Sequence, residues 1–284
     1  MELVTLREVL NAAEKGGYAV GAFNANNMEI VQAIMQAAAE ERSPVILQAS
    51  QGAINYAGLD YIVAMVKTGA RGTDVPVVLH LDHGTDFLQV MRCMRAGFSS
   101  VMFDGSRLPL AENMEITRKV AEIGRAVGVS VEGELGKIGG TEDDISVSEK
   151  DALFTDPLEA QQFVRETGVD ALAVAIGTAH GFYKGRPELD FPRLERIREL
   201  TGASIVMHGA SGVFDEDVRR GIDRGIRKIN IDTDLRQAFV RAMQGQIAES
   251  PDNIDPRKVM GPAREALKKV IREKMRLFGC AGKA

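Results

Sequence analysis

The sequence of 284 residues has few cysteines and no excess of positive charge. Cys93 and Cys280 are too few and too far apart for a disulfide framework, which is typical of a reducing compartment. With 35 Lys and Arg against 40 Asp and Glu, the formal net charge is −5. This charge argues against general binding to nucleic acids or anionic membranes, because both require a broad positive surface. Any anion must therefore be bound locally.

Long apolar runs and targeting segments are also missing. Residues 1–8 contain no basic segment followed by an apolar stretch, and no run approaches the roughly 18 apolar residues of a membrane span. The 45% of hydrophobic and 26% of charged residues is a normal globular balance. We therefore expect a cytoplasmic protein with no membrane or nucleic-acid partner.

Positive charge is concentrated near the C-terminus. Nine basic and three acidic residues lie between positions 255 and 284. We interpret most of these basic residues as a solvated helix face, with contact to an anion or another subunit as the alternative.

Short aliphatic runs that end in small or polar residues alternate with amphipathic stretches along the chain. The runs are 18–24, 45–50, 75–83, 100–104, 129–135, 171–180, 204–208 and 227–232. Helical patterns lie between them, for example at 28–41, 110–127, 157–167, 192–200 and 215–224. Glycines at 97, 128, 168, 202 and 225 each follow a helical pattern, as C-terminal caps do.

Eight such units in about 250 residues predict an α/β fold, a (β/α)8 TIM barrel, with additional C-terminal helices. No linker or composition break divides the chain, so we predict a single domain over 1–284 in which 254–284 is a helical extension. A doubly wound open sheet is the alternative. It is weakened because Gly21-Ala22-Phe23-Asn24 stands where a Gly-x-Gly-x-x-Gly turn would be expected.

In a TIM barrel the active site lies at the carboxyl ends of the strands, so the residues that close each run become candidates. They are Asn24, Ser50, Asp82, His83, Asp104, Glu132, Glu134, His180, His208, Asn230 and Asp232. Three of the four histidines of the chain are in this set. Three histidines at one barrel mouth are typical of a zinc site with an open coordination position. His80, inside its strand, is better interpreted as a packed histidine or one that supports the ligands.

Carboxylates accompany these histidines. Asp82 is an acid/base candidate, although strict alternation would send Asp82 and His83 to opposite faces unless the strand ends there. Asp104 and Glu134 could supply a second metal position or orient the histidines. Glu132 and Glu134 share a strand face, so one of them could be structural and salt-bridged.

Residues 136–155 form a connection longer than a typical loop of about 2–6 residues between a strand and a helix. Its glycines permit motion, so Glu142 could close over a substrate as a general base. A solvated acidic loop is the alternative.

Two small-residue segments favour anion binding. Residues 208–212 and 230–234 follow the seventh and eighth predicted strands, where exposed backbone N–H groups and a helix N-terminus often bind phosphate. Lys184, after the sixth strand, could neutralise a phosphate.

These motifs together resemble the class II metal-dependent fructose-1,6-bisphosphate and tagatose-1,6-bisphosphate aldolases, and the resemblance covers essentially the whole chain. The matching segments are Gly-Ala-Phe-Asn at 21–24, Leu-Asp-His-Gly at 81–84, Ser-Val-Met-Phe-Asp-Gly-Ser at 100–106, Val-Glu-Gly-Glu-Leu-Gly at 131–136, Gly-Gly-Thr-Glu-Asp-Asp at 139–144, Ala-Ile-Gly-Thr-Ala-His-Gly at 175–181, His-Gly-Ala-Ser-Gly at 208–212, Lys-Ile-Asn-Ile-Asp-Thr-Asp at 228–234 and Asp-Pro-Arg-Lys at 255–258.

The resemblance implies a role for each matching residue. It implies zinc bound by His83, His180 and His208, with Asp104 and Glu134 near an alternative position for a second divalent ion. Asp82 would exchange a proton with the C4 oxygen, Glu142 would deprotonate dihydroxyacetone phosphate, and Asn230 would contact the enediolate. One phosphate would be bound by Gly181, Lys184, Gly209, Ser211, Asp232 and Thr233. Arg257 from a neighbouring subunit would bind the other, with Ser50 nearby, and Asn24 is a further substrate contact. A monovalent cation, Na⁺ or K⁺, often lies beside the first phosphate.

The expected function is a lyase of carbohydrate metabolism that reversibly cleaves fructose 1,6-bisphosphate, through a zinc-stabilised enediolate, into dihydroxyacetone phosphate and glyceraldehyde 3-phosphate. This is a reaction of glycolysis and gluconeogenesis, and a homodimer or homotetramer is expected. The tagatose epimer is the close alternative substrate. A metal-dependent barrel hydrolase and a non-enzymatic sugar-phosphate-binding protein are alternatives of other classes.

Overall fold

The computed structural model describes residues 2–142, 145–148, 153–183 and 185–284. Eight parallel strands close into a barrel in the order β1-β11-β10-β8-β5-β4-β3-β2, which confirms the predicted fold class. They are β1 (Val20–Asn24), β2 (Val45–Ser50), β3 (Val77–Gly84), β4 (Ser100–Phe103), β5 (Ser130–Leu135), β8 (Ala171–Val174), β10 (Ser204–Met207) and β11 (Ile226–Ile231).

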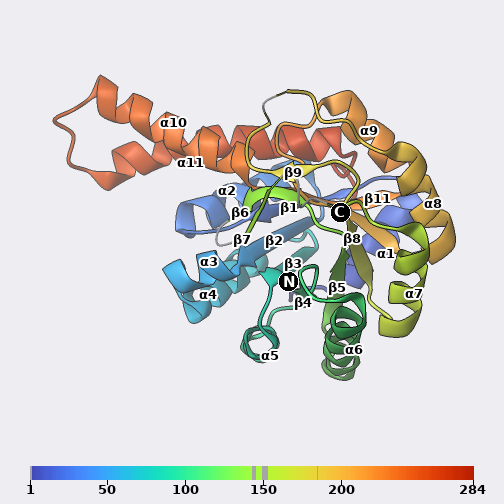
Figure 1. Cartoon of the computed structure of the whole chain (residues 1–284). Helices are drawn as coiled ribbons and strands as arrows, with labels where there is room; N and C mark the ends of the chain where they lie inside the picture. Colours follow the sequence, from blue (N-terminus) through green and yellow to red (C-terminus); the bar gives the residue numbers. More distant parts are fainter. Residues whose placement is uncertain (1, 143–144, 149–152, 184) are drawn as a thin grey trace.

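Helices surround this barrel (Figure 1). They are α1 (Leu6–Gly16), α2 (Met28–Glu41), α3 (Gln51–Ala57), α4 (Leu59–Arg71), α5 (Phe87–Ala96), α6 (Leu110–Val127), α7 (Pro157–Thr167), α8 (Phe191–Thr201), α9 (Asp215–Asp223), α10 (Thr233–Glu249) and α11 (Pro256–Leu277). None of the helices in these described stretches is long and apolar enough to cross a membrane.

Local capping explains why several helices have the predicted bounds. Asn27 caps α2 by accepting a hydrogen bond from the backbone N–H of Ile30 at 2.9 Å. Gly128 and Gly168 end α6 and α7 with φ of 74° and 65°. This left-handed conformation costs glycine little, so these positions stop their helices where the sequence predicted.

The predicted sixth strand, residues 171–180, is wrong beyond Val174. β8 ends at Val174, and Ala179–His180 forms a separate strand, β9. Gly177 lies between them with φ of 109°, and a Cβ atom there would come within 2.2 Å of the Glu188 carbonyl oxygen. His180 therefore does not close a barrel strand.

The long connection after β5 is also more structured than predicted. It contains β6 (Gly139–Glu142), which pairs antiparallel with β7 (Ile145–Val147) and parallel with β9. This small three-stranded sheet places the backbone of Glu142 on the strand that pairs with His180.

The opposite end of the barrel is covered by α1. The backbone N–H of Arg7 donates to Ser130 Oγ at 3.0 Å, and Arg7 Nε donates to Asp170 at 2.6 Å. These partners lie at the amino ends of β5 and β8, so α1 leaves the carboxyl ends of the strands as the open face.

The additional C-terminal helices of the predicted fold class are present, and α10 and α11 form a hairpin that projects from the barrel (Figure 1). The solvated-face interpretation of the basic tail is wrong for several of its residues. Arg276 and Arg272 each lie 2.7 Å from Glu41, and Lys268 lies 3.0 Å from Glu40. These ion pairs attach α11 to the end of α2.

Candidate metal and anion site at the barrel mouth

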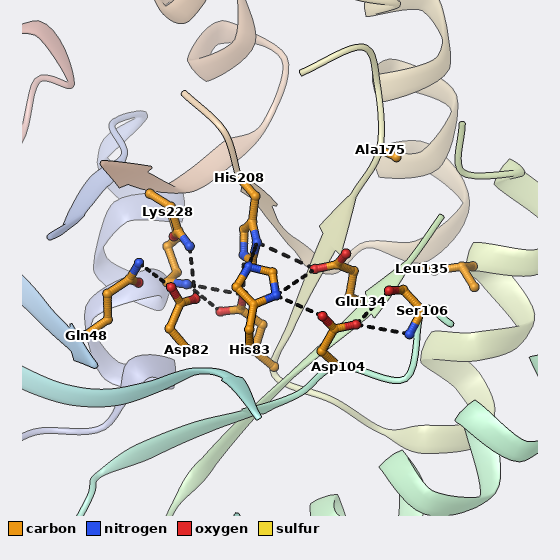
Figure 2. A network of polar contacts seen from close by, with 12 residues as sticks. Gln48, Asp82, His83, Asp104, Ser106, Glu134, Leu135, Ala175, His208 and Lys228 are labelled. Atoms are coloured by element: carbon orange, nitrogen blue, oxygen red, sulfur yellow. Dashed lines mark hydrogen bonds and ion pairs between the residues drawn. The ribbon is translucent and has the colours of Figure 1, made fainter. Parts of the chain in front are cut away.

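The carboxyl end of β3 carries two adjacent polar residues, Asp82 and His83. The β3–β4 register shifts between Leu81 and Gly84, and His83 adopts a φ of 47°. This irregularity relaxes the strict alternation of a strand, so Asp82 and His83 both reach the barrel mouth (Figure 2).

His83, His180 and His208 converge as the sequence predicted. All three are buried, and their potential ligand nitrogens lie within 4.8 Å of one another. The ring centroids of His83 and His208 are 4.7 Å apart, and those of His83 and His180 are 5.2 Å apart. The set therefore has the composition and spacing of a three-histidine zinc site.

The hydrogen bonds of two of these rings favour a bound cation. His83 Nδ1 lies 2.9 Å from Asp104, and His208 Nε2 lies 3.0 Å from Glu132. When His83 Nδ1 and His208 Nε2 carry the ring protons and donate them to these carboxylates, the other two nitrogens carry only lone pairs. These nitrogens, His83 Nε2 and His208 Nδ1, face each other at 3.0 Å. A zinc ion bound to both nitrogens would relieve this repulsion, since tetrahedral Zn–N bonds place nitrogens roughly 3.3 Å apart.

Asp104 and Glu134 lie beside His83 and form a second possible metal group with it. Burial alone would raise the pKa of Asp104, but hydrogen bonds from His83 and Ser106 hold it below its ordinary value. Burial and the neighbouring Asp104 carboxylate raise the pKa of Glu134 well above its ordinary value. Glu134 Oε2 accepts no hydrogen bond from the described residues, and it lies 3.5 Å from His208 Nδ1. Two close carboxylates with an orphaned oxygen fit a cation at this position.

Asp82 is surrounded by side-chain amides. Its carboxylate accepts hydrogen bonds from Asn24 at 3.3 Å, from Gln48 at 2.9 Å and from Asn230 at 3.2 Å. Gln48 also donates to Asn24 at 2.6 Å. Sequence reasoning missed Gln48, although it lies two residues before Ser50 and therefore on the same strand face.

An anion-sized cavity of about 50 Å³ opens beside His180. Its lining includes the predicted residues Gly181, Gly209, Ser211, Asp232 and Thr233, together with Thr141, Asn230 and Arg236. Thr233 begins α10, so the positive end of a helix dipole faces the cavity. Sequence reasoning missed Arg236, which follows Asp232 by one helical turn and pairs with it at 2.7 Å.

The other predicted site residues are not among the described side chains that surround the histidines or line the cavity. Ser50 is buried at the end of β2 and caps α3 by accepting from Ala53 N at 3.1 Å. Lys184 and the side chain of Glu142 lie outside what the structure describes. The side chain of Arg257 is 90% exposed at the start of α11, paired with Asp255 at 2.8 Å and on the projecting hairpin.

Curated proteins of similar sequence are aldolases. The chain is 47% identical to the fructose-bisphosphate aldolase of Thermus caldophilus, over 99% of this chain and 100% of that protein. It is 48% identical to the fructose-bisphosphate aldolase of Geobacillus stearothermophilus, over 100% of this chain and 99% of that protein.

Solved structures and a family model lead to the same family. The YdjI aldolase from Escherichia coli K12 superimposes with a TM-score of 0.87 at 33% identity, over 99% of both chains. A putative fructose-1,6-bisphosphate aldolase from Coccidioides immitis gives a TM-score of 0.90 at 30% identity, over 98% of this chain and 97% of that one. The family model described as fructose-bisphosphate aldolase class-II matches residues 4–283, so the chain belongs to the class II fructose-bisphosphate aldolase family.

Proposed function

We propose that this protein catalyses the reversible cleavage of fructose 1,6-bisphosphate into dihydroxyacetone phosphate and glyceraldehyde 3-phosphate. The observation that carries the proposal is the convergence of three buried histidines, an amide-held aspartate and an anion cavity at one barrel mouth. A hydrolase or a non-enzymatic binding protein does not require this combination.

His83, His180 and His208 would hold zinc, and Asp104 with Glu134 would form an alternative position for a second divalent ion. Zinc there supplies Lewis-acid stabilisation of the negative charge that develops when the C3–C4 bond breaks. Lys184 needs no role as a nucleophile in this account and is assigned to phosphate binding. A monovalent cation beside the first phosphate remains part of the proposal.

The side chains around the zinc position would move the protons. Asp82, held by three amides, takes the proton of the C4 hydroxyl during cleavage and returns it during condensation. Glu142 lies on β6, which pairs with the strand of His180, and it acts as the base that exchanges a proton of dihydroxyacetone phosphate. Asn230 contacts both Asp82 and the anion cavity, and there it orients the enediolate.

The two phosphates would be bound at separate places. Gly181, Gly209, Ser211, Asp232 and Thr233 hold the phosphate of dihydroxyacetone phosphate, where backbone N–H groups and the α10 N-terminus supply positive potential. Ser50 would lie near the other phosphate, and Asn24 would be a further substrate contact. Arg257 lies in the first turn of α11, and the hairpin of α10 and α11 projects from the barrel (Figure 1). Arg257 would therefore reach a substrate only on another subunit. We therefore infer a homodimer or homotetramer. We also propose that the protein is cytoplasmic and that each chain is one domain.

Assays of the purified, zinc-loaded protein with both epimers test this proposal. We expect a higher kcat/KM for fructose 1,6-bisphosphate than for tagatose 1,6-bisphosphate. The opposite order would reassign the substrate, and cleavage of neither sugar would contradict the proposed function. Proton exchange between dihydroxyacetone phosphate and solvent distinguishes an aldolase from a hydrolase, because only the aldolase deprotonates that carbon.

A further inference from the structure

A charged cluster lies inside the barrel, below the proposed zinc site. Glu132 on β5 and Lys228 on β11 each precede a mouth residue, Glu134 and Asn230, by two positions. They therefore face the barrel interior one layer deeper. His80 on β3 has the same relation to Asp82.

The interior of a TIM barrel is usually filled by branched apolar side chains, and here this layer is ionic. Glu132, Lys228 and His80 are each 0% exposed. Lys228 Nζ lies 2.9 Å from Oε2 and 3.2 Å from Oε1 of Glu132. Burying such a pair costs desolvation energy that apolar side chains would avoid, so stability alone does not account for it.

The pair is connected to the proposed metal site through one hydrogen bond. Glu132 Oε1 lies 3.0 Å from His208 Nε2, on the side of the ring away from His83. When Glu132 accepts the Nε2 proton, the other ring nitrogen of His208, Nδ1, is left with its lone pair toward His83. Glu132 thereby determines which nitrogen of His208 can bind a metal.

Lys228 keeps the Glu132 carboxylate in this orientation. Its Nζ lies near both carboxylate oxygens, and His208 Nε2 lies 3.0 Å from one of them, Oε1. On the opposite side, His80 Nε2 lies 3.5 Å from both Lys228 Nζ and Glu132 Oε2, and His80 Nδ1 lies 2.8 Å from Ser100 Oγ. These contacts restrict rotation of the Glu132 carboxylate, so that its Oε1 stays directed at His208 Nε2.

We propose that Lys228 is a positioning residue that acts through Glu132 to fix His208 with Nδ1 directed at the zinc position. The proposal deepens the proposed function, on which it rests, and it concerns the metal affinity of the chain's own histidines. Lys228 touches neither substrate nor metal in this account.

Zinc affinity of the full-length apoprotein, measured by competition with a chromogenic chelator, tests the proposal. Lys228→Met keeps much of the side-chain length and removes the charge, and Glu132→Gln keeps the shape of the acceptor and removes its charge. We expect each variant to bind zinc about 10- to 100-fold more weakly than wild type, the usual effect of losing a partner that orients a metal ligand. The double variant should bind zinc little more weakly than the single variant with the larger loss of affinity, because both substitutions break the same chain of contacts from Lys228 through Glu132 to His208.

The matched control is Thr167→Ala on α7, which removes a buried hydrogen bond to the Phe163 carbonyl and leaves the contacts among His80, Lys228, Glu132 and His208 in place. Its zinc affinity should stay within about twofold of wild type. The absorption spectrum of the Co²⁺-loaded proteins gives a second readout, because a misoriented His208 alters the ligand geometry, whereas a general loss of stability does not. If Lys228→Met fails to fold, Lys228→Gln, which also removes the charge and keeps a polar end, replaces it in the same measurements.

Wild-type zinc affinity and an unchanged cobalt spectrum in Lys228→Met would overturn the proposal, whatever Glu132→Gln shows. A wild-type protein that binds zinc but cleaves no sugar bisphosphate would instead contradict the proposed function and leave the role of Lys228 standing. The two failures are therefore distinguishable.

Discussion

His83 reaches the barrel mouth beside Asp82 because its backbone leaves the extended conformation, with a φ of 47°. The sequence predicted the importance of both residues, since polar side chains that close a buried strand are unusual. It could not predict how adjacent residues share one face, because this depends on the register shift between β3 and β4. The sequence also indicated that Glu132 could form a salt bridge. It could not identify the partner, Lys228, because that residue lies 96 positions away in the chain.

Gln48 is the residue-scale test of how Asp82 is positioned. Gln48→Leu removes one of three amide donors to the carboxylate. A hydrogen bond to a charged group is worth about 1.5–3 kcal/mol, so we expect kcat to fall about 10- to 100-fold with little change in KM. Steady-state kinetics with fructose 1,6-bisphosphate measure both constants.

The control is the same change at an exposed helix position, Gln36→Leu, which should leave kcat unaltered. Zinc content should stay equal to wild type in both variants. An unchanged kcat in Gln48→Leu would show that the other two amides suffice.

Most of the secondary structure was predictable, because strand and helix periods alternate regularly and glycines end the helices. The segment around His180 was not. The apolar run from 171 to 180 resembles one strand, and only the backbone at Gly177, held close to Glu188, divides it into β8 and β9. This division attaches His180 to the small sheet that carries Glu142 rather than to the barrel.

Tyr183 joins the segment of His180 to the loop after β10. Its hydroxyl accepts a hydrogen bond from Ala179 N and donates one to the Gly209 carbonyl, both at 2.7 Å. Tyr183→Phe removes both bonds between elements that line the anion cavity. We expect KM for dihydroxyacetone phosphate in the condensation reaction to rise by up to about 30-fold, since each of the two bonds contributes about 1 kcal/mol. Tyr56→Phe, at a side chain 80% exposed, is the control and should leave KM unchanged.

The attachment of α11 to α2 predicts a dependence of stability on pH. A hydrogen bond from Arg276 lowers the pKa of Glu41 from its ordinary value of 4.5. Its stabilising effect is therefore complete above about pH 4.5 and is lost as the pH falls through the lowered folded-state pKa. Between pH 6 and pH 3, thermal unfolding should show a larger fall in Tm for wild type than for Glu41→Gln. Parallel Tm curves for the two proteins would contradict this.

At the scale of the whole molecule, we propose that a chain with a net charge of −5 binds anions through local features. The proposed features are the start of α10 beside the cavity and Arg257 on the projecting hairpin. The sequence predicted where the charges lie along the chain. It could not distinguish Lys268, Arg272 and Arg276, which pair with α2, from Arg257, because that distinction depends on how α11 packs.

Arg257 tests the role of a second subunit. Arg257→Ala should raise KM for fructose 1,6-bisphosphate about 10- to 100-fold with a smaller effect on kcat, since a guanidinium binds phosphate through strong paired hydrogen bonds. Lys258→Ala removes a neighbouring exposed charge and should leave KM near wild type. Equal KM values for both variants and wild type would show that Arg257 does not bind the substrate.

The central claim is that three histidines at the barrel mouth hold the metal that makes this chain an aldolase. Cleavage of fructose 1,6-bisphosphate, measured before EDTA treatment, after it and again after adding one equivalent of zinc, tests that claim most directly. We predict loss of activity with the chelator and its recovery with zinc. Full activity in protein shown to be free of metal would contradict the account.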